Sequence, residues 1–112
     1  MRKTIKIGSQ DIDFEANASI LLIYHRNFFS DYFTDVTLAL SSYGDNGAIN
    51  VRYLRTDLMA QIIYALAKCA DKTLPTCEEW LASFELDDFD VNQIFSELLE
   101  LICRDLKSVK KN

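Results

Sequence analysis

The chain of 112 residues is long enough for one domain and carries a formal net charge of −5, from 12 lysines and arginines against 17 aspartates and glutamates. This acidic balance argues against nucleic acid as a partner, because phosphates are bound by basic surfaces. No apolar run approaches the roughly 20 residues of a membrane-spanning helix, and residues 1–10 lack the apolar segment of a signal peptide, so we expect no membrane partner.

Residues 4–16, TIKIGSQDIDFEA, predict a β-hairpin. Apolar and polar residues alternate on both sides of a turn that contains Gly8. One face of the hairpin is therefore apolar and consists of Ile5, Ile7, Ile12 and Phe14. Because an isolated hairpin is only marginally stable in water, we expect this face to lie on the rest of the chain.

The next segment is rich in aromatic residues. Apolar side chains at spacings of three and four predict a helix over at least residues 18–33, with Asn17 as its N-cap. The aromatic side chains are Tyr24, Phe28, Phe29, Tyr32 and Phe33, and they span more than one helical face. Two interpretations are open: the helix is sandwiched between the hairpin and other helices, or part of the aromatic band is a protein-binding or self-association surface.

Residues 41–50 contain two of the three glycines and predict a loop. Residues 51–54 are either extended or lead directly into the next helix. That helix is predicted over 58–70, capped by Thr56 or Asp57, with apolar residues recurring every four positions. We expect it to be central, because its small residues (Ala60, Ala65, Ala67 and Ala70) allow a neighbouring helix to approach closely.

Two short signals define the C-terminal part. Thr76 and Glu79 follow the only proline, Pro75, and predict a capped helix over 77–84 that carries the only tryptophan, Trp80. Asp90 and Gln93 predict a second cap, for an amphipathic helix over 91–107. A basic tail at 108–112 is expected to fray.

These elements predict an α+β fold in one domain, residues 1–112: an N-terminal β-hairpin (4–16) packed on a mostly helical body (18–107) of about four helices.

The sequence contains no recognisable catalytic, cofactor-binding or metal-binding motif. His25 is the only histidine, and no cysteine or histidine partner lies at a metal-ligand spacing from it. Asp31 and Asp35 lie one helical turn apart and could share a face, although such pairs are usually solvated. The three cysteines form no C-x-x-C pair, which is typical of reduced thiols in a cytosol. We therefore expect a non-enzymatic protein without a cofactor.

Three segments occur in order along the chain and share features with one protein family. The first is the hairpin followed by IYHR at 23–26, Phe29 and Asp31; the second is AKCAD at 67–71, then Pro75, EWL at 79–81 and FE at 84–85; the third is the closing amphipathic helix with its lysine-rich end. Together they resemble the small tail assembly chaperones of long-tailed bacteriophages and prophages, particularly those of Gram-positive hosts. The chain departs from the family at 17–20, NASI, where many relatives carry a proline.

This resemblance implies a chaperone that binds the tape measure protein, keeps it soluble and helps to recruit tail tube subunits. Such proteins act in the cytoplasm of the bacterial host cell and are absent from the mature virion. The candidate protein-binding residues are Tyr24, Phe28, Phe29, Tyr32 and Trp80, and self-association would cover them when no client is present. The alternative is another small acidic phage- or prophage-encoded protein-interaction module, such as an adaptor or an inhibitor. This alternative would be favoured if the gene lies outside a tail operon.

Overall fold

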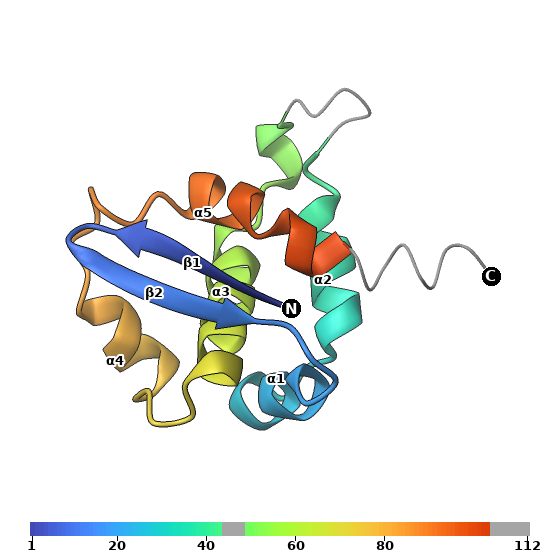
Figure 1. The fold of residues 1–112 in the computed structure, drawn as a ribbon. Helices are drawn as coiled ribbons and strands as arrows, with labels where there is room; N and C mark the ends of the chain where they lie inside the picture. Colours follow the sequence, from blue (N-terminus) through green and yellow to red (C-terminus); the bar gives the residue numbers. More distant parts are fainter. Residues whose placement is uncertain (44–48, 104–112) are drawn as a thin grey trace.

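An N-terminal hairpin lies across a group of helices in the computed structural model, which describes residues 1–43 and 49–103 (Figure 1). The hairpin consists of β1 (Arg2–Ile7) and β2 (Gln10–Glu15), paired antiparallel. The helices are α1 (Ile20–Phe28), α2 (Tyr32–Leu40), the short 3₁₀-helix η1 (Val51–Tyr53), α3 (Thr56–Ala70), α4 (Cys77–Ala82) and α5 (Val91–Glu97). The predicted α+β fold, a hairpin on a mostly helical body, is confirmed.

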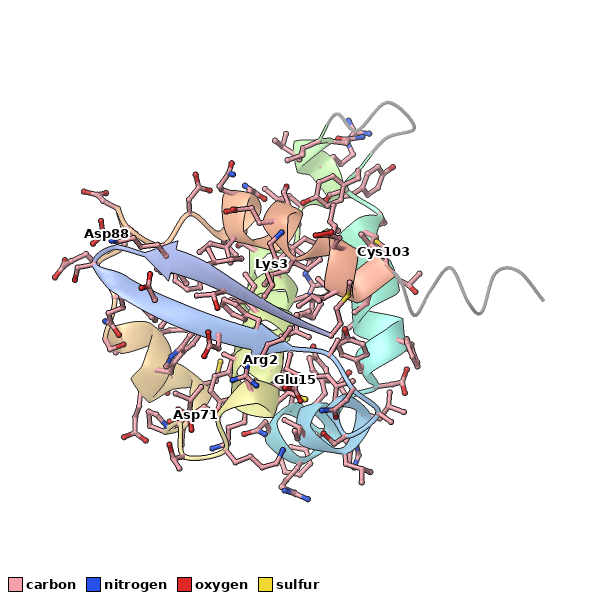
Figure 2. All side chains as sticks on the ribbon, viewed as in Figure 1. Arg2, Lys3, Glu15, Asp71, Asp88 and Cys103 are labelled. Atoms are coloured by element: carbon pink, nitrogen blue, oxygen red, sulfur yellow. The ribbon has the colours of Figure 1, made fainter. Side chains whose placement is uncertain are left out.

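The hairpin turns over two residues, with Ile7 opposite Gln10. Gly8 has a φ of 62° and is the only residue of this loop with a positive φ, the arrangement of a type II′ turn. A Cβ atom on Gly8 would lie 3.0 Å from Oδ2 of Asp88, whose side chain lies beside the turn (Figure 2). The turn is therefore in contact with the connection between α4 and α5.

Helix α3 is at the centre of the structure, as predicted. It contacts β2 on one side and α1, α2, α4 and α5 around the others (Figure 1). Nine of its fifteen residues are buried. The hairpin contributes Ile5, Ile7 and Phe14 to the same core, so the alternation in the sequence correctly identified the face that is buried.

The continuous helix predicted over 18–33 is wrong, because the chain breaks between α1 and α2. Phe29 adopts a left-handed conformation, with φ 53° and ψ 38°, and ends α1. Asp31 then caps α2, its carboxylate accepting a hydrogen bond from the Thr34 amide at 2.9 Å. The helix also begins later than predicted, at Ile20, after a turn in which the Asn17 carbonyl accepts from the Ile20 amide. The break lets α1 and α2 pack separately on α3.

Other boundaries are confirmed in part. Helix α3 begins at Thr56, and neither Thr56 nor Asp57 is its N-cap; Asp57 forms an ion pair with Arg55 at 2.9 Å instead. Thr76 and Asp90 cap α4 and α5 as predicted, accepting hydrogen bonds from the Glu79 and Gln93 amides.

The C-terminal helices are shorter than predicted. Helix α4 ends at Ala82 rather than at residue 84. Helix α5 ends at Glu97, and after a turn at Leu98 residues 99–103 are helical again. The remainder of the predicted 91–107 helix, the basic tail at 108–112 and part of the predicted 41–50 loop lie outside the described residues.

Lys3 connects the hairpin to the end of the described chain. Its ammonium group donates to the Glu97 carbonyl at 2.9 Å and lies 3.3 Å from the Glu100 carboxylate. Arg2 stays within the hairpin and pairs with Glu15 at 2.9 Å and with Asp13 at 3.4 Å. Arg2 and Lys3 are therefore both paired with carboxylates of the chain itself.

Replacing Gly8 with alanine should destabilise the protein by about 1 kcal/mol, because an L-residue at this positive φ is strained. Gly8→Asn is the matched control, since asparagine tolerates the left-handed region better than alanine does. Urea unfolding followed by circular dichroism measures both. Equal stability of Gly8→Ala and the wild type would show that the turn does not require a positive φ at this residue.

Candidate functional site

The five predicted protein-binding residues fall into three environments. Tyr24, Tyr32 and Trp80 are buried in the core, with exposed fractions of 0%, 1% and 4%. Phe28 is half-buried, and Phe29 is 84% exposed. In this conformation only Phe28 and Phe29 can touch a partner, so most of the aromatic band packs between α3 and its neighbours.

Tyr24 belongs to a buried polar contact. Its hydroxyl donates to Oδ2 of Asp35 at 2.7 Å and lies 3.1 Å from Oε1 of Gln61 on α3. Burial, followed by the hydrogen bond and negative charge of Asp35, raises the pKa of Tyr24 well above its usual value. Asp35 is thus a structural partner of Tyr24, and Asp31 is a helix cap, so the two carboxylates do not form a joint site.

Phe28 begins a row of aromatic rings that runs along α3 to α4. Its ring centroid lies 6.1 Å from that of Tyr64, which lies 5.8 Å from Trp80. Trp80 in turn meets Phe84 at 5.1 Å and Phe89 at 6.1 Å, both nearly edge-on. These separations and tilts are typical of favourable aromatic pairs, so the row forms a rigid wall.

Two adjoining hollows open beside this row. Their volumes are about 470 and 360 Å³, and they share Ala60 and Leu81 in their walls. The first is lined by Thr56, Ala60, Leu81, Phe84, Leu86, Phe89 and Val91, and the second by Phe28, Asp57, Ala60, Gln61, Cys77, Glu78 and Leu81. Both volumes are within the range of about 300–1,000 Å³ that is usual for binding sites. We refer to the two hollows together as the α3–α4 groove.

The groove exists because α4 is short. The helix covers only six residues and ends at Ala82, after which the chain turns away. The small side chain of Ala60 leaves space on α3 at this point, and no helix of the described residues fills it. Leu86, in the turn that follows, is 90% exposed on the edge of the groove. The groove therefore offers apolar contact surface that the core does not use.

The groove wall contains one thiol, that of Cys77. Burial raises the pKa of the Cys77 thiol to about 11, so this wall residue is protonated at neutral pH and a weak nucleophile. His25 is exposed on α1, outside the groove. Across residues 1–43 and 49–103, no three histidine, cysteine, aspartate or glutamate side chains are grouped to hold a metal ion.

Sequence reasoning missed most of the groove. Phe28 was among the predicted protein-binding residues, but Leu81, Phe84, Leu86 and Phe89 were not. A weak signal was present at Leu86, an apolar residue between Glu85 and Asp87 that falls in neither predicted helix. A single exposed leucine is common on protein surfaces, so Leu86 alone does not predict a groove.

Comparison with protein-family models, curated proteins and solved structures gives no match to this chain. None of the helices in the described part of the chain has the length and apolar character needed to cross a membrane. Inference about function therefore depends on the groove, on the charges around it and on the resemblance found in the sequence.

Replacing Tyr24 with phenylalanine should lower the free energy of unfolding by about 1–3 kcal/mol, because the buried Asp35 carboxyl loses its donor. Tyr53→Phe is the matched control: this ring is 52% exposed, and its loss of a hydroxyl should change stability by no more than about 0.5 kcal/mol. Chemical denaturation of both variants provides the measurement. Similar losses in the two would contradict a structural role for the Tyr24–Asp35 contact.

The same contact should make stability fall at alkaline pH. The pKa of Tyr24 is raised in the folded state. Its protonated hydroxyl therefore contributes fully to the free energy of unfolding below the unfolded-state pKa of 10.0, and this contribution is lost as pH rises above that value. Above pH 10 the free energy of unfolding should fall by about 1.4 kcal/mol per pH unit because of this tyrosine. Unfolding curves between pH 9 and 11 should therefore show a shallower decline for Tyr24→Phe than for the wild type. Parallel declines would refute the assignment.

Proposed function

We propose that this chain is a phage tail assembly chaperone that binds the tape measure protein and keeps it soluble. It also helps to recruit tail tube subunits. It acts in the cytoplasm of the bacterial host cell, is absent from the mature virion, and works by binding rather than by catalysis, without a cofactor.

The observation that carries this proposal is the α3–α4 groove. Its walls are largely apolar, Leu86 at its edge is 90% exposed, and Phe28 lies at its other end. Apolar grooves of this kind bind the apolar face of a partner helix. A chaperone that binds a long, apolar, helical client needs such an apolar surface. It must also stay soluble itself, and a net charge of −5 favours solubility.

The resemblance supplies the identity of the client. The family-like segments at 67–71 and 79–85 lie on either side of the connection between α3 and α4. In this connection the Pro75 carbonyl accepts a hydrogen bond from the Tyr64 hydroxyl at 2.6 Å. Tyr64 also packs against Trp80, whose ring lies next to the groove wall. The family-like residues in this part of the chain are thus scaffold residues that shape the groove, and the tape measure protein is the client that the family implies.

Co-expression tests the proposal directly. The tape measure protein encoded beside this gene should be insoluble alone and should remain soluble and co-purify when this chain is co-expressed. An acidic protein of similar size provides the control for a general solubilising effect. Failure to co-purify under conditions that keep both proteins soluble would overturn the proposal, as would equal rescue by the control protein.

A further inference from the structure

On the α4–α5 side of the groove the chain carries one sign of charge only, whereas on the α3 side Arg55 is paired with Asp57 of the groove wall. Residues 73–103 contain eight aspartates and glutamates and no lysine or arginine. Six of the acidic residues lie in the groove wall or directly next to wall residues in the chain. Glu79 accepts a hydrogen bond from the Thr76 hydroxyl and Asp88 lies against Gly8, which leaves Glu78, Glu85, Asp87 and Asp90. All four are exposed, and we refer to them as the acidic rim.

The acidic rim is not neutralised by the chain, within residues 1–43 and 49–103. The ion pairs formed there occupy other carboxylates: Asp13 and Glu15 pair with Arg2, Glu100 with Lys3, and Asp57 with Arg55. No lysine or arginine of these residues reaches a rim carboxylate. These four carboxylates elsewhere are thus paired with cations, whereas those of the acidic rim present their charge to whatever binds there.

Three of the described cations lie together at a different place. Arg26, Lys68 and Lys72 line a separate hollow between α1 and the C-terminal half of α3, together with Ile23 and Asn27. A basic area therefore lies at this end of α3, and the acidic rim lies at the end that begins at Thr56, where Arg55 is paired with Asp57. This division favours a partner that carries positive charge where it meets the groove.

The walls of the groove also indicate the partner's backbone conformation. None of the lining residues belongs to a strand, so the groove does not offer the row of free backbone groups that an extended peptide needs to pair as a strand. The partner must therefore satisfy its own backbone hydrogen bonds when it enters an apolar site, which a helix does.

We propose that the α3–α4 groove binds an amphipathic helix of a partner protein whose apolar side chains fill the space over Ala60 and whose lysines and arginines face the acidic rim. This inference rests on the proposed function in one respect: the tape measure protein is the expected source of the helix. Leu86 and Phe28 hold the two ends of the helix's apolar face. The rim selects basic helices and rejects acidic ones by like-charge repulsion.

Trp80 gives a direct readout of binding. It is the only tryptophan, and its ring contacts Phe84 and Phe89, both of which line the groove. Three synthetic peptides of about 20 residues, long enough to form a helix, are the probes. One has an apolar face and a lysine-rich polar face, one keeps that apolar face with glutamate in place of lysine, and one keeps the lysine peptide's composition with its apolar residues dispersed.

The lysine-rich amphipathic peptide should shift the Trp80 emission and bind at least about tenfold more tightly than either of the others, a preference that added salt reduces. Equal binding of the lysine and glutamate peptides would overturn the role of the rim. Equal binding of the dispersed peptide would show attraction by charge alone and would overturn the groove as a helix site.

Two substitutions locate the site. Leu86→Ser removes the exposed edge residue, and Ala60→Phe fills the floor, so each should weaken binding of the lysine-rich peptide about tenfold or more. Leu22→Ser is the matched control, since Leu22 is 67% exposed on α1 and outside the groove. Circular dichroism of each variant verifies folding. Equal weakening by Leu22→Ser, or none by both groove variants, would overturn the proposal.

The peptide and co-expression experiments separate the two proposals. If the tape measure protein co-purifies with the Leu86→Ser and Ala60→Phe variants as it does with the wild type, the groove inference fails and the chaperone function stands. If the lysine-rich peptide binds in the groove but the tape measure protein does not co-purify, the groove inference stands and the chaperone function fails.

Discussion

The burial of α3 around most of its circumference is the constraint on which the rest of this structure depends. A helix with nine buried residues out of fifteen needs apolar cover around most of its circumference. The hairpin supplies one side, and α1, α2, α4 and α5 supply the others. Each covering element is short, between six and nine residues, and isolated helices or hairpins of that length are unstable in water. They are held in place because they lie on α3.

The sequence predicted the elements whose signals are local. The hairpin follows from alternation around Gly8, and the caps at Thr76 and Asp90 follow from side chains that reach an amide three residues away. Helix α3 follows from its four-residue apolar spacing. The break between α1 and α2 was missed, because apolar spacing continues through it. Asp31 followed by Thr34 was the available sign, since aspartate is a favoured N-cap.

The candidate site was harder to predict, because exposure depends on which elements cover which faces. Tyr24 and Phe29 belong to one aromatic band in the sequence, yet one is fully buried and the other is 84% exposed. Helical spacing cannot distinguish the two residues. Phe29 is itself the left-handed residue that ends α1, and this conformation turns its side chain outward. The groove also depends on where α4 ends relative to α3, which the sequence does not show. Leu86 was the one sequence feature that could have indicated it, although alone it does not predict a groove.

The contact of Lys3 with Glu97 and Glu100 has a consequence for how the chain folds during synthesis. It joins residues 94 and 97 positions apart, and α5 contributes Ile94 and Phe95 to the core that the hairpin also enters. The two strands of the hairpin are made first, but their apolar face has no complete cover until α5 has been made. Such a dependence on distant contacts makes folding slow relative to a bundle of local helices. The nascent chain therefore exposes part of its apolar core surface until α5 has been made.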